Sequence, residues 1–268
     1  MDIVHISDPH FSESNQYLVD NLDKFRHALS GMLEKFQDPY LLVTGDITLQ
    51  GKKEGYDMAT KFFNSFIDSK LLKRENFFCC PGNHDIEDIV NPFSAFETFC
   101  YSVRRDHKLN FSKKGHVSVD IQNTKYSLLL INSAFHGDHT FGLISTDTLL
   151  KLESLAQSQR SWIIATHHHL IPNFEDDIST TRNAYSLLYW AERAKVDLIL
   201  HGHQHSDLQL TVGDNRVKIK SCRSFSFGSF PIQNGGNIIS LKNSVSVKNF
   251  TVNHDIIPNK IKFEIVEL

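Results

Sequence analysis

Five short segments of this 268-residue chain place aspartate, asparagine or histidine directly after an apolar run. Carboxylate, amide and imidazole groups serve as metal ligands and as acid–base catalysts. Taken alone, each segment is more simply a turn, a helix cap or a packed histidine, but five in series are not explained that way. The segments are Asp8-Pro9-His10, Gly45-Asp46, Gly82-Asn83-His84-Asp85, His167-His168-His169 and Gly202-His203-Gln204-His205.

The chemistry that these groups could do together is metal-assisted. Two or more carboxylates, an amide and several imidazoles that converge without a counter-ion would be strongly destabilised, and a pair of metal ions removes this conflict. The mixed oxygen and imidazole set suits Mn²⁺, Fe²⁺ or Zn²⁺, with no cysteine to favour a closed structural zinc site. One carboxylate shared by two ions would hold them roughly 3.5–4 Å apart, the separation used for in-line displacement at phosphorus.

The elements that must position these groups follow from the hydrophobic pattern. Apolar runs alternate with amphipathic stretches, which predicts an α/β core with right-handed crossovers and the five segments at its ligand-binding edge. After Asp207 the strands become short and turn-linked, which predicts mostly antiparallel pairing. The predicted strands cover residues 2–7, 40–44, 77–80, 116–121, 126–131, 162–166, 197–200, 208–212, 217–221, 237–241, 244–251 and 261–266, and the predicted helices 22–36, 56–67, 93–103, 145–155 and 184–194.

Composition limits the classes of protein that fit. Lys and Arg number 28 and Asp and Glu 31, so a net charge of −3 provides no general field for nucleic acid. The start of the chain lacks a signal-peptide pattern, and no apolar run approaches the roughly 20 residues that cross a bilayer. Four cysteines without C-x-x-C spacing predict buried thiols and no disulfide framework. We therefore expect a soluble, cytoplasmic protein that does not contact membranes.

The five segments, in this order, resemble the signature blocks of the calcineurin-like metallophosphoesterase superfamily. They extend from Asp8 to His205, about three quarters of the chain. The resemblance implies a four-layer α/β/β/α sandwich of two mixed sheets with flanking helices and a binuclear metal site at the strand C-terminal edge. We expect one domain over residues 1–268, with a helical insertion at about 86–114.

The resemblance also assigns metal ligands. It implies two divalent ions, with Mn²⁺ or Fe²⁺/Fe³⁺ favoured and Zn²⁺ or Ni²⁺ as alternatives, and Asp46 as the ligand that bridges them. The fourth block usually reads His-His-Pro-Pro or His-Gly, so the ligand assigned to His167 could instead be His168. The remaining ligands are Asp8, His10 and His205 for one ion, and Asn83, His167 and His203 for the other.

The implied reaction is attack on phosphorus by a hydroxide that bridges the two ions. His84 would stabilise the phosphoryl oxygens or protonate the leaving group, with Asp85 orienting its ring.

The sequence suggests further substrate contacts, each of which also has a purely structural explanation. Arg104 and Arg105 could clamp a phosphate or form a solvated helix face. His168 and His169 could line the rim, His136 and His139 could reach the substrate from a loop, and Phe225, Phe227 and Phe230 could stack on a base or fill the core.

The favoured substrate is a small phosphodiester such as a cyclic nucleotide. The stretches 45–56 and 78–85 are most similar to the cyclic-nucleotide and small-diester branch of the superfamily. A nuclease of the same superfamily is the first alternative, but the net charge disfavours a nucleic-acid partner. The second is a non-catalytic scaffold on the same fold, which is disfavoured because every ligand position and His84 are kept. Oligomeric state is not indicated.

Overall fold

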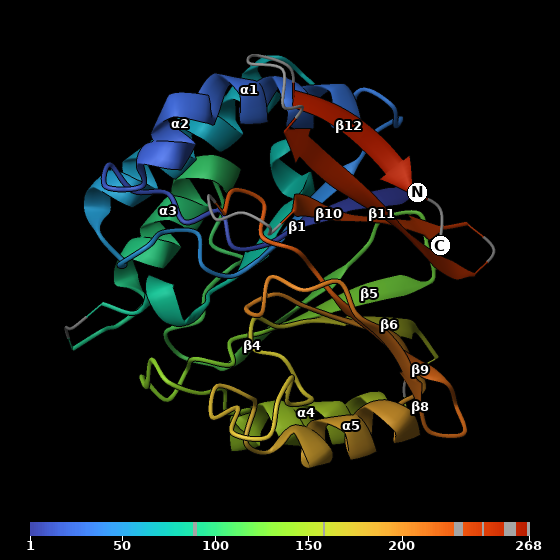
Figure 1. Cartoon of the computed structure of the whole chain (residues 1–268). Helices are drawn as coiled ribbons and strands as arrows, with labels where there is room; N and C mark the ends of the chain where they lie inside the picture. Colours follow the sequence, from blue (N-terminus) through green and yellow to red (C-terminus); the bar gives the residue numbers. More distant parts are fainter. Residues whose placement is uncertain (88–89, 158, 228–232, 243, 255–260, 267–268) are drawn as a thin grey trace.

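The computed structural model describes residues 1–87, 90–157, 159–227, 233–242, 244–254 and 261–266. These residues form two six-stranded sheets that lie face to face, with helices on both outer sides (Figure 1). The strand orders are β12-β11-β10-β1-β2-β3 and β4-β5-β6-β7-β9-β8. Both sheets are mixed, and the predicted four-layer α/β/β/α architecture is confirmed.

The first sheet has a parallel half and an antiparallel half. Its parallel strands are short and almost fully buried, which explains their continuous apolar sequence. β10 pairs antiparallel with β1 and with β11, as predicted for the C-terminal part. The strands are β1 (Asp2–Ile6), β2 (Tyr40–Thr44), β3 (Phe77–Cys80), β10 (Asn234–Leu241), β11 (Val245–His254) and β12 (Ile261–Val266).

The second sheet has parallel strands at its centre and an antiparallel strand at each edge. β5, β6, β7 and β9 run parallel, and β4 and β8 pair antiparallel at the two edges. The partly exposed β4 is an edge strand, and the fully buried β5 lies beside it. The strands are β4 (His116–Asp120), β5 (Tyr126–Ile131), β6 (Ser161–Ala165), β7 (Val196–His201), β8 (Gln209–Val212) and β9 (Val217–Ser221).

Helices cover the outer face of each sheet (Figure 1). α1 (Gln16–Leu33), α2 (Lys53–Asp68) and α3 (Ser94–Arg104) flank the first sheet, and α4 (Thr146–Leu155) and α5 (Ala184–Arg193) flank the second. Short 3₁₀ turns, η1 (Arg74–Asn76) and η2 (Asn83–Asp85), border β3. α1 begins before its predicted start at residue 22 because Asn15 caps it, accepting a hydrogen bond from the Leu18 amide at 3.2 Å.

Two apolar cores hold the layers together. Along β6, Ile163 and Ala165 belong to the core shared with the first sheet, and Trp162 and Ile164 belong to the core beneath α4 and α5. This alternation follows from the period of two along a strand. All four cysteines are buried and unpaired by disulfides, as predicted.

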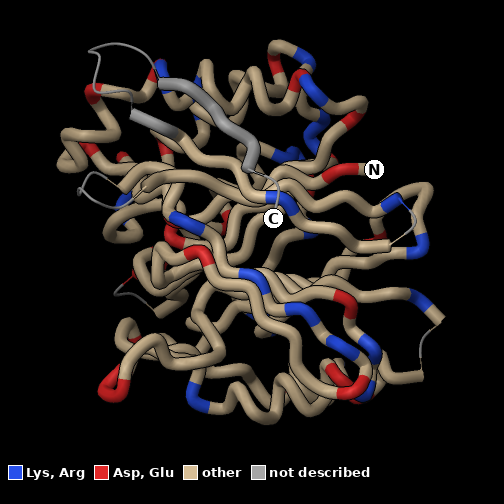
Figure 2. The backbone as a smooth tube through the Cα atoms, turned by 45° about the vertical axis from the view of Figure 1, so that its right-hand side comes forward, with Lys and Arg blue, Asp and Glu red and all other residues tan. Residues whose placement is uncertain are grey.

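The surface carries both signs of charge. Figure 2 shows Lys and Arg interspersed with Asp and Glu over the elements of both sheets and their helices. Within the described residues, none of the helices combines the length and apolar character needed to span a bilayer.

Candidate metal centre

The candidate ligands lie at one edge of the molecule because the strands that carry them are parallel. Each follows the C-terminal end of a strand, so the chain leaves all five strands on the same side. The predicted convergence is thereby found in the structure. Asp8 and His10 follow β1, Asp46 follows β2, Asn83 follows β3, His167 follows β6, and His203 and His205 follow β7.

The first group consists of Asp8, His10 and His205. His205 Nε2 lies 3.4 Å from Asp8 Oδ1 and 3.5 Å from His10 Nε2, and His10 Nε2 lies 4.0 Å from Asp8 Oδ1. Two ligands bound to one ion at about 2.1 Å lie roughly 3–4 Å apart. These three atoms therefore have the spacing of a coordination shell.

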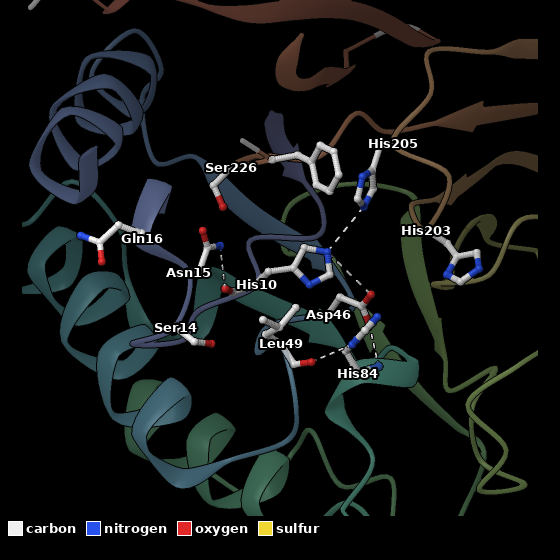
Figure 3. Close-up of a pocket in the computed structure, with 11 residues that line it drawn as sticks. His10, Ser14, Asn15, Gln16, Asp46, Leu49, His84, His203, His205 and Ser226 are labelled. Carbon is white, nitrogen blue, oxygen red and sulfur yellow. Dashed lines mark hydrogen bonds and ion pairs between the residues drawn. The ribbon is translucent and has the colours of Figure 1, made fainter. Parts of the chain in front are cut away.

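The second group consists of Asp46, His167 and His203, with Asn83 beside them. His167 Nε2 lies 3.0 Å from Asn83 Oδ1, 3.1 Å from His203 Nδ1 and 3.3 Å from Asp46 Oδ2. Asp46 Oδ2 is also 4.0 Å from His10 Nε2 in the first group. Asp46 thus lies between the two groups, where a bridging ligand must be. Figure 3 shows its contact with His10 of the first group.

The choice between His167 and His168 follows from their hydrogen bonds. His167 Nδ1 donates to the Thr44 carbonyl oxygen at 2.9 Å, which leaves Nε2 directed at Asp46 and Asn83. His168 instead turns its Nδ1 to Ser133 Oγ at 2.8 Å. The geometry therefore favours His167 as the ligand.

Left-handed backbone conformations are concentrated at the ligands. Non-glycine residues rarely adopt a positive φ, and such strain is maintained where the surrounding structure fixes it. Here it turns successive side chains into one small volume at the strand ends. The ligands concerned are Asp8 (φ 52°), His10 (48°), Asp46 (50°), His203 (70°) and His205 (50°).

Two glycines allow the loops to approach this closely. A Cβ at Gly82 would lie 2.2 Å from Asp46 Oδ1, and one at Gly45 would lie 2.3 Å from His167 Nδ1. Gly45 also has a φ of 81°. Both positions thus require glycine for shape.

The electrostatics of the cluster fit a site for cations. Burial alone lowers the pKa of His167, but the adjacent Asp46 carboxylate outweighs burial and raises it to about 9. Burial likewise opposes ionisation of Asp8, and the neighbouring His205 still holds the pKa of Asp8 below its usual value. Asp8 Oδ1 is buried and accepts no hydrogen bond, as expected for an atom whose partner is a metal ion. The residues present therefore fit two divalent ions.

The predicted role of Asp85 is wrong. His84 Nδ1 donates to the Leu49 carbonyl oxygen at 2.7 Å, so Leu49 orients the ring. The Asp85 carboxylate is turned away, accepting hydrogen bonds from the Gly82, Ile47 and Thr48 amides and the Tyr56 hydroxyl at 3.0–3.1 Å. Burial raises the pKa of Asp85 to about 6 against these donors. Asp85 therefore ties the loop after β2 to the loop after β3.

The predicted phosphate clamp is also wrong. Arg104 is buried and donates to the carbonyl oxygens of Glu75 and Phe77 and to both carboxylate oxygens of Asp106. Phe77 begins β3, whereas the metal ligands follow its other end, about 10 Å further along the strand. Arg105 follows at the C-cap of α3. The sequence shows two adjacent arginines, but it does not show that Arg104 lies at the end of β3 away from the metal ligands.

His168 and His169, which were also predicted as substrate contacts, pack around the metal centre and do not line the cavity beside it. His168 and His169 are buried, and their rings lie 4.7 and 5.4 Å from that of His203. His169 Nε2 pairs with Asp177 at 2.7 Å. The geometry thus supports packing behind His203 and gives no support to a substrate contact. His139 does reach the centre, donating from Nδ1 to the Asn83 carbonyl oxygen at 3.0 Å.

A cavity of about 520 Å³ opens beside the two groups (Figure 3). Of the predicted phenylalanines, Phe227 lines it, Phe225 is buried in the core, and Phe230 lies outside the described residues. Most of the other lining residues were not predicted, because they belong to no recognisable sequence motif. The lining consists of His10, Ser14, Asn15, Gln16, Asp46, Leu49, His84, His203, His205, Ser226 and Phe227.

A four-layer sandwich with two adjacent groups of candidate metal ligands at one edge is the arrangement expected of a two-metal phosphoesterase. The profile of the calcineurin-like phosphoesterase family matches residues 1–207. The chain therefore belongs to this family and is a phosphoesterase that binds divalent metal.

Similar proteins include two bacterial proteins named probable cyclic nucleotide phosphodiesterases. The one from Vesicomyosocius okutanii subsp. Calyptogena okutanii is 28% identical over 228 residues, which are 83% of this chain and 85% of the relative. The one from Pseudoalteromonas sp. is 27% identical over 214 residues, 77% and 72% of the two chains. Among solved structures, a dimetal phosphatase from Danio rerio shares the fold, with a TM-score of 0.63, 13% identity and coverage of 94% and 95%.

Proposed function

We propose that this protein hydrolyses a small phosphodiester, such as a cyclic nucleotide, at a centre of two divalent metal ions. The observation that carries the proposal is the position of Asp46 between two complete ligand groups beside an open cavity. The names of the relatives support the choice of a nucleotide diester. When bound, the two ions would polarise the phosphoryl oxygens and lower the pKa of the attacking water.

The ions would be held by the groups described above. Asp8, His10 and His205 would bind one ion, Asn83, His167 and His203 the other, and Asp46 both. Mn²⁺ or iron suits this mixture of carboxylate, amide and imidazole ligands.

His84 is the residue in the cavity that can move a proton. Its Nδ1 is occupied by the Leu49 carbonyl oxygen, so Nε2 is the nitrogen left for the substrate. The His84 main-chain amide donates to Asp46 Oδ1 at 2.9 Å, which places the ring beside the bridging carboxylate. A protonated Nε2 would donate to the phosphoryl group or to the leaving oxygen.

The charge of the cavity favours a diester over a monoester. A monoester dianion is usually recognised by arginine or lysine, which pair with its additional charge. Among the residues that the structure describes, the cavity lining contains neither residue type. A diester carries one negative charge and needs no such partner. The same lining disfavours a nuclease, whose strand of phosphates requires a basic groove.

The proposal is tested with the His84→Ala variant and bis(p-nitrophenyl) phosphate in the presence of Mn²⁺. We expect unchanged metal content by elemental analysis and a turnover about 10²- to 10⁴-fold lower, the usual contribution of a general acid. The control is His27→Ala, an exposed histidine on α1. Unchanged turnover in His84→Ala would remove His84 from the mechanism. Absence of diester hydrolysis by the wild-type protein would refute the proposed function.

A substrate panel then separates the candidates. Cyclic nucleotides, dinucleotides, aryl phosphate monoesters and single-stranded DNA are compared at equal Mn²⁺. We expect the small diesters to have the highest kcat/KM. The cavity volume of about 520 Å³ is enough for a whole small ligand, and its described lining residues include no lysine or arginine. A preference for DNA would favour the nuclease instead.

A further inference from the structure

We propose that the apolar part of the cavity lining, Phe227 and Leu49, holds a planar aromatic ring of the substrate, a nucleobase or an aryl group, by apolar contact. The protein would recognise the flat shape of the ring and would make no hydrogen bonds to its polar edge. This inference rests on the proposed function, since it describes what the substrate carries beyond its phosphoryl group.

The cavity is larger than a phosphoryl group requires. Its volume of about 520 Å³ is typical of pockets that enclose whole small ligands. The metal-ligand groups account for one side only. The rest of the lining comes from the start of α1 and from Leu49, Ser226 and Phe227 in the loops. A substrate that fills the cavity must therefore contact this wall as well as the metal ions.

Phe227 stands beside the metal centre and is partly exposed. Its ring centroid lies 4.7 Å from that of His205, with the planes inclined by 60°. The backbone amide of Phe227 donates to Asn234 Oδ1 at 2.8 Å, which holds the main chain at Phe227 in place. Because His205 is a ligand of the first group, an aromatic arm of a bound diester would lie within reach of Phe227.

Each polar side chain of this wall makes at least one hydrogen bond within the protein, and Ser14 Oγ lies 2.8 Å from Ser12 Oγ. Asn15 accepts from the Leu18 amide and donates to the His10 carbonyl oxygen. The Gln16 amide nitrogen donates to Asp20, and Ser226 Oγ donates to the Pro9 carbonyl oxygen. The ring of Phe227 and the side chain of Leu49 remain for the ligand. Affinity therefore has to come from stacking, which every base and aryl group can provide.

Calorimetric titration of the full-length, Mn²⁺-loaded protein tests the inference without catalysis. AMP and ribose 5-phosphate carry the same phosphate, so the ratio of their dissociation constants measures the contribution of the base. We expect AMP to bind about tenfold more tightly, as one stacked base typically provides. AMP, GMP, CMP and UMP should bind within about fivefold of one another.

Variants assign the effect to the ring. Phe227→Ala should bind AMP and ribose 5-phosphate equally, and Phe227→Tyr should keep the wild-type ratio. The matched control, Phe174→Ala, removes an exposed phenylalanine that does not line the cavity and should change nothing. Circular dichroism and manganese content establish that each variant is folded and loaded.

Two results would overturn the inference. One is an equal affinity of the wild-type protein for AMP and ribose 5-phosphate, or a ratio that survives in Phe227→Ala. The other is a preference of more than about thirtyfold for a single base, which would show hydrogen-bond recognition. Absence of diester hydrolysis refutes the proposed function but leaves this binding ratio measurable, so the two failures are distinguishable.

Discussion

Asp46 is the residue on which the two-metal interpretation depends most directly. It lies 3.3 Å from His167 Nε2 in one ligand group and 4.0 Å from His10 Nε2 in the other. Asp46→Asn removes the negative charge that both ions would share, so we expect metal content by elemental analysis to fall at both sites. His205→Ala, which alters one group only, should lose about one ion. Retention of one full equivalent by Asp46→Asn would contradict a shared ligand.

Residue types and order predicted the ligands, but side-chain directions required the structure. Asp, Asn and His at successive strand ends converge because parallel strands leave the sheet on one side, and this follows from the sequence. Neighbours in a tight turn point in different directions, however. His84 faces the cavity while Asp85 accepts backbone hydrogen bonds behind it. Spacing along the chain contains no information on that difference.

Among the secondary-structure elements, α3 provides a test of the corrected role of Arg104. Its guanidinium group is buried among two carbonyl oxygens and Asp106, so Arg104→Ala would leave these acceptors unpaired. We expect the free energy of unfolding to fall by about 2–4 kcal/mol. Arg105→Ala alters an exposed side chain on the same helix end and should cost less than about 0.5 kcal/mol.

The measurements are urea denaturation and diester kinetics of both variants. KM of the folded Arg104→Ala protein should equal that of the wild type, because the arginine lies at the far end of β3 from the metal centre. A raised KM with unchanged stability would instead restore the phosphate clamp.

The strands were more predictable than the ends of the helices. Residues 40–44 and 77–80 form strands with the predicted bounds, because buried parallel strands are uninterrupted apolar runs with clear ends. α1 was predicted too short, since its first turn is polar and begins at the Asn15 cap. That same polar turn lines the cavity, which explains why this part of the lining was not predicted.

At the scale of the whole molecule, the two sheets meet through a buried polar network as well as through apolar side chains. His5 on β1 donates from Nε2 to Thr44 Oγ1 on β2 at 2.9 Å, and its Nδ1 accepts from Asn237 on β10 at 3.1 Å. Asn237 also donates to the Ser221 carbonyl oxygen on β9 of the second sheet. His5 is thus a buried residue between the sheets, and its two hydrogen bonds require the neutral imidazole.

This network predicts how stability depends on pH. Burial, aided by the nearby His201, lowers the pKa of His5 from 6.5 to about 3. Between these two values the unfolded chain binds a proton that the folded chain does not, so stability is present above pH 6.5 and is lost as the pH falls. For one such group the loss of stability between pH 7 and pH 5 is about 2 kcal/mol.

We therefore expect urea denaturation of the metal-free protein to give a free energy of unfolding that decreases over this range. The free energy of unfolding of His5→Gln should decrease by about 2 kcal/mol less. Other buried histidines act equally in both proteins and cancel in the comparison, and His27→Gln on the surface is the control. Parallel pH profiles for the wild type and His5→Gln would show that His5 is not held neutral between the sheets.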